Sequence, residues 1–142
     1  MANTIIKGRP AHGAVVEGEA IVCPNSIQGW SGFDTKTGVI IEKGHVHEGD
    51  SVAGKILVVP CSRGSVGWSM YAHWCALNGV GPKGYIVTKM DTKCGTAVIL
   101  TDVPCVTDFP EGVDPCAIIH SGDYIRLDGE KGTVEILKKA ES

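Results

Sequence analysis

The chain has 142 residues, of which 43% are hydrophobic and 20% are charged, and its formal net charge is −3. This length allows one real core but is short for two ordinary domains, so we predict a single domain over residues 1–142. The absence of a basic surplus argues against nucleic acid as a partner. No apolar run approaches the roughly 20 residues of a membrane span, and the first residues do not resemble a secretion signal. We therefore expect a cytoplasmic protein with no membrane partner.

Short apolar segments separated by glycine-rich stretches predict a protein built mainly of strands. The expected strands are residues 4–9, 14–22, 39–42, 55–59, 84–88, 104–106, 124–127 and 133–137. Residues 128–132, with the sequence Asp-Gly-Glu-Lys-Gly, are a strong signal for a hairpin between the last two strands.

Apolar side chains recur at spacings of four and three between residues 66 and 77, which is typical of one face of a helix. They are Val66, Met70, Trp74 and Leu77. Asn78 and Gly79 are expected to end this helix, and its apolar face is expected to lie against a sheet. A second helix is predicted over residues 93–100, although Gly95 and the β-branched residues disfavour it.

The residues most suggestive of chemistry are Cys61-Ser62-Arg63-Gly64-Ser65, between the apolar stretch 55–60 and the first helix. A strand-to-helix turn points backbone N–H groups at whatever lies above it, which favours an anionic ligand. Arg63 could clamp a carboxylate or phosphate there. On the residues alone, an equally weighted interpretation is that Ser65 caps the helix and Arg63 is a solvated surface residue.

Two loops and the cysteines are weaker candidates. Trp30 and Phe33 are too apolar to be left in solvent, so they pack either into the core or against a partner. His45 and His47 could bind a metal, but two histidines without a third ligand nearby favour a polar loop.

The cysteines at positions 23, 61, 75, 94, 105 and 116 lack a C-x-x-C pair, so we expect mostly reduced core residues and no metal on this chain. Cys61 is the exception because it belongs to the turn.

Motifs along nearly the whole chain resemble those of the aconitase X family, specifically its small, swivel-domain subunit. They are Gly8-Arg9, Gly18-Glu19-Ala20, Pro24-Asn25-Ser26, Gly29-Trp30-Ser31-Gly32-Phe33-Asp34, Thr37-Gly38, Gly54-Lys55-Ile56-Leu57-Val58-Val59-Pro60, Arg63-Gly64-Ser65 and Gly122-Asp123-Tyr124-Ile125. The sequence departs from the family around the turn, where Cys61-Ser62 replaces a glycine before the arginine and the usual run of serines is missing.

The resemblance implies an α/β fold, namely a swivelling β/β/α domain with a β-barrel-like sheet and flanking helices. It also implies the small subunit of a hydro-lyase that dehydrates a hydroxy acid and is active only with a large subunit, which holds an iron–sulfur cluster. Ser65 matches the serine that the family uses as proton acceptor, with Ser62 as the runner-up. Arg63, Gly64 and Ser62 are the expected substrate-binding residues.

The substrate is the least determined part of this expectation. Family members dehydrate cis-3-hydroxy-L-proline in bacteria and mevalonate 5-phosphate in archaea. The chain lacks the charge enrichment of hyperthermophile proteins, which favours cis-3-hydroxy-L-proline, with mevalonate 5-phosphate as the alternative. A different alternative is a non-catalytic module in which Arg63 and Ser65 bind an anionic effector; a mobile carrier would use His45, His47 or Lys83.

Overall fold

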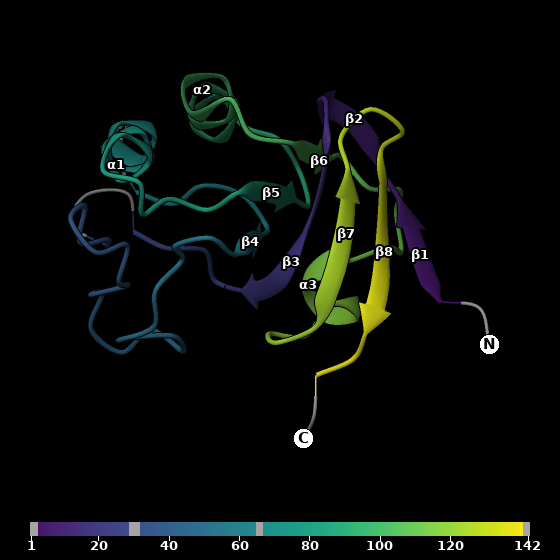
Figure 1. The fold of residues 1–142 in the computed structure, drawn as a ribbon, viewed down its shortest axis with the longest axis horizontal. Coiled ribbons are helices and arrows are strands. Elements are labelled where there is room, and N and C mark those ends of the chain that lie inside the picture. Colours follow the sequence, from purple (N-terminus) through teal and green to yellow (C-terminus); the bar gives the residue numbers. More distant parts are fainter. Residues whose placement is uncertain (1–2, 29–31, 65–66, 141–142) are drawn as a thin grey trace.

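The structure is a computed structural model that describes residues 3–28, 32–64 and 67–140. These residues form eight strands and three helices (Figure 1). In chain order they are β1 (Thr4–Lys7), β2 (Arg9–His12), β3 (Val15–Val22), β4 (Ile56–Val59), α1 (Gly67–Leu77), β5 (Gly84–Val87), α2 (Thr92–Thr101), β6 (Cys105–Thr107), α3 (Pro115–Ile118), β7 (Tyr124–Asp128) and β8 (Thr133–Lys138).

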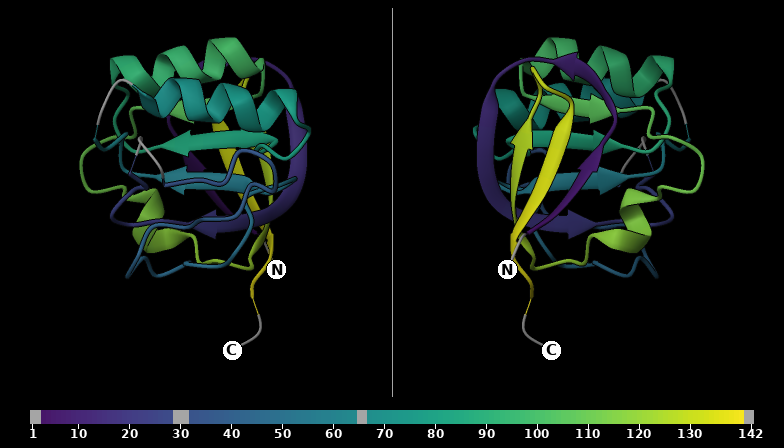
Figure 2. Two further views of the ribbon diagram at one scale, coloured as in Figure 1. Left: turned by 90° about the vertical axis from the view of Figure 1, so that its left-hand side faces the viewer. Right: turned by 90° about the vertical axis from the view of Figure 1, so that its right-hand side faces the viewer.

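All eight strands belong to one sheet with the order β1-β8-β7-β3-β4-β5-β6-β2. The strands β3, β4, β5 and β6 are parallel, and the remaining pairs are antiparallel. The two outer strands, β1 and β2, follow one another in the chain with only Gly8 between them, so the sheet curls round until its edges come together (Figures 1 and 2). This is the predicted β-barrel-like sheet with flanking helices.

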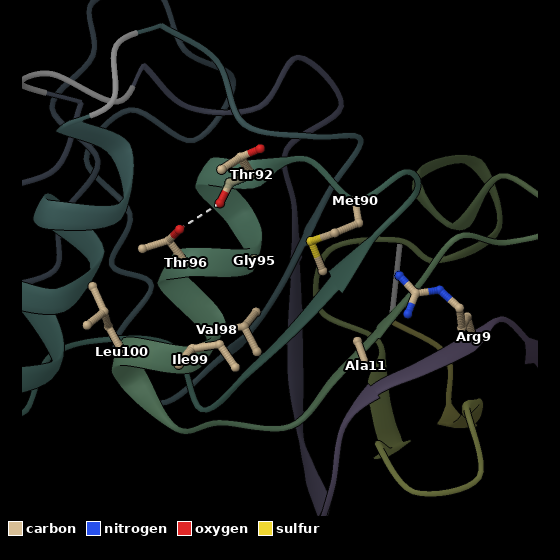
Figure 3. A pocket seen from close by; sticks show the side chains of 9 residues that line it. All are labelled: Arg9, Ala11, Met90, Thr92, Gly95, Thr96, Val98, Ile99 and Leu100. Carbon is tan, nitrogen blue, oxygen red and sulfur yellow. Dashed lines mark hydrogen bonds between the residues drawn. The ribbon is translucent and has the colours of Figure 1, made fainter.

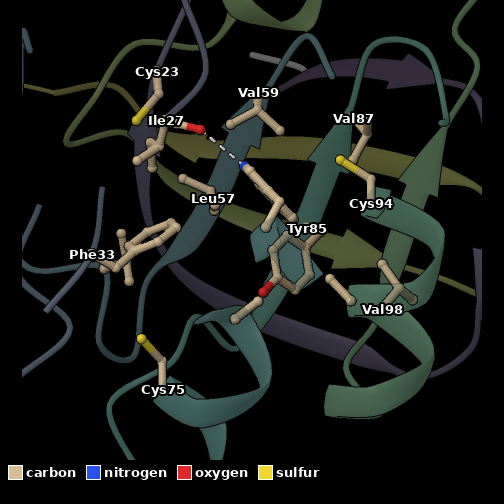
Figure 4. Packing of buried hydrophobic residues seen from close by; sticks show 14 of the residues in the cluster. Cys23, Ile27, Phe33, Leu57, Val59, Cys75, Tyr85, Val87, Cys94 and Val98 are labelled. Atoms are coloured by element: carbon tan, nitrogen blue, oxygen red, sulfur yellow. Dashed lines mark hydrogen bonds between the residues drawn. The ribbon is translucent and has the colours of Figure 1, made fainter. Parts of the chain in front are cut away.

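The parallel strands separate two hydrophobic cores. Every residue of β4 and β5 is buried, as expected for parallel strands that are covered on both faces. Leu57 and Val59 face α1, α2 and the loop that follows β3, where Ile27 and Phe33 also pack (Figure 4). On the opposite face, residues of β4 pack with apolar residues of β7 and β8 inside the curled sheet. Figure 2 shows α1 and α2 side by side above the parallel strands.

The helix α1 exists where it was predicted, but the predicted face is wrong. Trp68, Ala72 and Cys75 are buried, whereas Met70 and Leu77 are 48% and 69% exposed. Trp74, at 41%, is exposed as well, and Val66 lies outside the described residues. The helix contains no Asp, Glu, Lys or Arg, so its periodicity fits two faces equally well. The large indole of Trp68 decides between them, because its N–H donates a hydrogen bond of 3.0 Å to the Ile27 carbonyl.

Other elements differ from the prediction in instructive ways. Residues 39–42 do not form a strand; Val39 and Ile40 make only isolated bridges, to Ser51 and Phe33, within the long loop between β3 and β4. The segment predicted as one strand over residues 4–9 ends at Lys7, and β2 and α3 were not predicted. The doubtful second helix is confirmed as α2, and the hairpin between β7 and β8 is confirmed too. In the described residues, no helix is both long enough and apolar enough to cross a membrane.

Candidate functional site

The candidate site is the turn that follows β4, formed by Cys61, Ser62, Arg63 and Gly64, and called the β4 turn below. Because β4, β5 and β6 are parallel, the segments that leave their carboxyl ends lie along one edge of the sheet. The β4 turn and the residues before α2 therefore meet there. The predicted turn between a buried strand and a helix is confirmed for these four residues, while Ser65 lies outside the described residues.

Ser62 joins the β4 turn to the start of α2. It is buried, and both its backbone N–H and its hydroxyl donate to one carboxylate oxygen of Asp91, at 2.8 and 2.7 Å. Asp91 is also the N-cap of α2, because its other oxygen accepts from the Cys94 N–H at 2.8 Å. Burial opposes ionisation of Asp91, but the bonds from Cys94 and Ser62 outweigh it and lower the pKa of the carboxyl. The Ser62 hydroxyl is thus committed to a structural bond.

Arg63 is held by two groups from the loop between β3 and β4. Its Nε donates to the Asn25 carbonyl at 2.8 Å, and its Nη2 donates to both carboxylate oxygens of Glu42, at 2.7 and 2.6 Å. The same carboxylate accepts from the Gln28 N–H at 2.7 Å. Although burial opposes ionisation of Glu42, the bond from Arg63 and the backbone bond from Gln28 lower its pKa. Arg63 is therefore a fixed cation and not a freely solvated side chain.

Gly64 has a backbone conformation that favours glycine. Its φ is +87°, in the left-handed region where an L side chain is strained. Its carbonyl accepts a hydrogen bond of 2.7 Å from the Lys93 ammonium, which comes from the first turn of α2. The Lys93 ammonium is thus held by the backbone of the residue that follows Arg63. The predicted binding residues Ser62, Arg63 and Gly64 are together in one place, and only Arg63 presents a charged side chain.

The histidines of the preceding loop fasten it to the rest of the fold. The His45 ring accepts from the His47 N–H at 2.9 Å, and its other nitrogen lies 2.8 Å from the Ser26 carbonyl. The His47 ring lies 2.9 Å from both the Asp50 carboxylate and the Ser121 hydroxyl. Each ring is satisfied by protein groups, which agrees with the polar-loop interpretation. Because Glu42 lies on this loop, these contacts also help to place the partner of Arg63.

The described residues offer no cluster that fits a metal ion. No three His, Cys, Asp or Glu side chains come together among them in a way that could hold one. The cysteines at positions 23, 75, 94 and 105 are buried and free, which confirms their prediction as core residues. Burial raises the pKa of Cys23 and Cys105 to about 12, so both are neutral thiols, which are poor ligands. Cys61 takes part in the turn through its carbonyl, which accepts from the Ser26 hydroxyl at 2.5 Å.

A groove of about 500 Å³ lies beside α2, but it does not include the β4 turn (Figure 3). Its walls are mostly apolar side chains of α2 together with Met90. The charged residue in it, Arg9, donates to the Asp108 carboxylate at 2.8 and 2.6 Å. The lining contains no His, Asp, Glu or Lys side chain. The β4 turn is therefore the better candidate for chemistry.

The comparison with known proteins decides the family. The family model for the aconitase X swivel domain matches residues 5–136. This chain belongs to the aconitase X swivel-domain family. It is 35% identical over 136 residues to the phosphomevalonate dehydratase small subunit of Thermococcus kodakarensis, covering 96% of this chain and 98% of that relative. The corresponding subunit of Pyrococcus furiosus is 33% identical over 136 residues, with the same coverage.

The solved structures agree with this assignment. The crystal structure of Thermococcus kodakaraensis aconitase X in its holo-form matches with a TM-score of 0.87 at 35% identity, over 95% of this chain and 99% of that one. The predicted swivel fold is therefore confirmed. The chain is the small subunit of an aconitase X type dehydratase, which also confirms the expected hydro-lyase class.

Sequence reasoning missed the partners that shape the site, namely Glu42, Asp91 and Lys93. Asp91 carried a recognisable signal, because an aspartate just before a helix is a common N-cap. Lys93 lies in the predicted second helix, and nothing in the sequence links it to the turn. Glu42 lies 21 residues before Arg63, and no local pattern links the two.

Proposed function

We propose that this chain is the small subunit of a mevalonate 5-phosphate dehydratase, and that its β4 turn closes over the substrate at the contact with a large subunit. The full-length likeness to small subunits named for that reaction is the observation that carries the proposal. The β4 turn supports it, because Arg63 keeps guanidinium N–H groups free for a carboxylate and the Lys93 ammonium has no ion-pair partner among the described residues.

Dehydration of a hydroxy acid requires two kinds of help. A base removes the proton next to the carboxylate, and a Lewis acid assists the departing hydroxide. The aconitase X family implies an iron–sulfur enzyme, and we place the cluster, which would supply the Lewis acid when bound, on the large subunit. This placement agrees with the chemistry of the chain, whose buried cysteines are neutral thiols.

We assign the base to Ser65 rather than to Ser62. The Ser62 hydroxyl already donates to Asp91, and Asp91 is itself needed as the cap of α2. A serine accepts a proton only when its alkoxide is stabilised, so Ser65 would need the positive charge of Arg63, two residues before it in the chain, or backbone N–H groups. Arg63 would also orient the substrate carboxylate through the part of its guanidinium that Glu42 and Asn25 leave free.

The proposed substrate is the one that the sequence analysis gave as the alternative. The low charge content placed cis-3-hydroxy-L-proline first, and that ranking stays untested. The names of the relatives support the alternative, mevalonate 5-phosphate. Charge content is a weak guide to substrate, because it reflects the temperature at which a protein works more than the reaction it performs.

The test is to co-express the chain with the large subunit encoded by the same organism and to measure dehydration of both substrates. We expect turnover of mevalonate 5-phosphate and little or none of cis-3-hydroxy-L-proline. Ser65→Ala should leave the complex assembled and reduce kcat by about 100-fold or more. Ser62→Ala should instead destabilise the chain by about 1–2 kcal/mol and leave turnover measurable.

Three outcomes would count against the proposal. Turnover of cis-3-hydroxy-L-proline alone would restore the first substrate. Normal turnover by Ser65→Ala with loss in Ser62→Ala would move the base to Ser62. An assembled complex with its cluster that acts on neither substrate would favour a non-catalytic anion-binding module.

A further inference from the structure

We propose that Lys93 is the specificity-determining residue that binds the phosphate group of the substrate. This inference rests on the proposed function, because it assumes a substrate with a phosphate ester as well as a carboxylate. It goes further by assigning the recognition of that ester to one side chain of the small subunit. The assignment follows from a comparison of two cations, because Arg63 is paired with a carboxylate and Lys93 is not.

The positive charge of Arg63 is largely balanced by the Glu42 carboxylate. Its Nη2 contacts both oxygens of Glu42, and its Nε is taken by the Asn25 carbonyl. One positive charge facing one carboxylate leaves little net charge for a ligand, and the remaining guanidinium N–H groups suffice for a single carboxylate. A phosphate ester that carries nearly two further negative charges requires another cation.

Lys93, which contacts the same turn, is not compensated in this way. Its ammonium donates to the Gly64 carbonyl at 2.7 Å, and no carboxylate of the described residues forms an ion pair with it. The carboxylate of the neighbouring Asp91 accepts instead from Ser62 and Cys94. An ammonium has three N–H donors, so Lys93 keeps two for a ligand. Its side chain is half-buried, which keeps the ammonium at the turn.

The position of Lys93 suits the shape of the substrate. Gly64, which holds the ammonium, directly precedes Ser65, the proposed base, in the chain. In mevalonate 5-phosphate, a short two-carbon arm joins the phosphate ester to the carbon that bears the leaving hydroxyl. The molecule therefore has two separate acidic groups, one for the Arg63 guanidinium and one for the Lys93 ammonium that the β4 turn holds. A substrate without a phosphate, such as cis-3-hydroxy-L-proline, has no group for this cation.

The experiment uses the assembled two-subunit enzyme with Lys93→Met, Lys93→Arg and the control Lys131→Met. Lys131 is exposed on the hairpin between β7 and β8, at the opposite edge of the sheet from the β4 turn. The substrates are mevalonate 5-phosphate and unphosphorylated mevalonate. A second readout is the Kd of mevalonate 5-phosphate for the Ser65→Ala complex, with and without Lys93→Met, by calorimetry.

We expect Lys93→Met to raise KM for the phosphorylated substrate, and its Kd, by roughly 10- to 100-fold, with kcat changed far less. The value of kcat/KM for unphosphorylated mevalonate should stay within about twofold, so that the preference for phosphate collapses. Lys93→Arg should restore most of the affinity, and Lys131→Met should match the wild type.

The inference is overturned if Lys93→Met leaves KM and Kd unchanged, or if it impairs both substrates equally, which would indicate a structural role for the bond to Gly64. Failure of the proposed function would look different. In that case the wild-type complex itself would not turn over mevalonate 5-phosphate.

Discussion

At the scale of single residues, the β4 turn takes its shape from partners far away in the sequence. Glu42 reaches Arg63 across 21 positions, and Asp91 reaches Ser62 across 29. Each carboxylate serves two groups at once, since Glu42 also accepts from Gln28. A residue that joins two segments in this way fixes the geometry of a turn more firmly than a cap within one segment.

The first prediction concerns the ion pair between Glu42 and Arg63. We expect Glu42→Gln to lower kcat/KM of the assembled enzyme by about fivefold, mostly through KM, because the guanidinium loses its anchor. The stability of the chain should change by only about 1 kcal/mol or less, since Arg63 is 41% exposed and solvent screens the pair. Steady-state kinetics and urea unfolding measure the two effects. Glu17→Gln, which removes a partner of Arg126 on β7, is the control and should leave KM unchanged.

The second prediction concerns Gly64. Because its φ is +87°, Gly64→Ala should cost about 1–2 kcal/mol in the free energy of unfolding. Gly112 provides a matched control, since its φ is +86° and no atom would lie within 4 Å of an added Cβ. Both variants should lose similar stability in urea, but only Gly64→Ala should also impair turnover. Equal activity in the two variants would show that the turn tolerates displacement.

At the scale of elements, α1 shows how a helix can be predicted with the wrong face inward. We expect Trp68→Ala to destabilise the chain by about 3–5 kcal/mol, because its indole is fully buried and hydrogen-bonded. Trp74→Ala should cost about 1 kcal/mol or less, since the ring is exposed and lies against Tyr71, at 5.4 Å between ring centroids. Thermal unfolding of the two variants measures the difference. A larger loss for Trp74 would mean that the spacing had indicated the right face.

The elements that the sequence predicted well are those whose patterns are local. Strands such as β4 and β5 are buried on both faces and read as continuous apolar runs, and the hairpin before β8 has its glycines where the turn needs them. Residues 39–42 look like a strand for the same reason, but only single bridges form there, because the loop turns sharply at Gly38 and Gly49, both with positive φ.

The candidate site likewise has one part that local sequence patterns predict and one part that depends on the tertiary structure. The β4 turn was found from its neighbours in the chain, a buried strand before it and a helix after it. Its partners Glu42 and Lys93 come from other elements, and only the fold brings them to Arg63 and Gly64. Local patterns therefore locate such a site, while its electrostatics are set by the tertiary structure.

At the scale of the whole molecule, the C-terminal segment is tied to the sheet by a buried carboxylate. Asp123 is fully buried and accepts from the Ala140 N–H at 2.7 Å, the His120 N–H at 2.9 Å and the Lys139 ammonium at 3.3 Å. These bonds connect the start of β7 with the end of β8. Burial opposes ionisation of Asp123, but the backbone donors and Lys139 outweigh it, so the pKa of its carboxyl is lowered in the folded chain.

This lowered pKa predicts how stability depends on acid. Because the unfolded chain binds this proton more readily, the stabilisation is complete above the ordinary aspartate pKa of about 3.9 and is lost as the pH falls through the lower folded value. We expect Asp123→Asn to cost about 2 kcal/mol at pH 7. The difference from wild type should narrow steadily below about pH 4, as the wild-type carboxyl becomes protonated.

Urea unfolding of both proteins between pH 7 and pH 2 measures this narrowing directly. Glu130→Gln, on the exposed hairpin tip, is the control and should track the wild type throughout. A constant difference between Asp123→Asn and the wild type over the whole range would contradict the prediction. It would show that the stabilising effect of Asp123 does not depend on its negative charge, because a contribution from the charge to the free energy of unfolding is lost when the carboxyl is protonated.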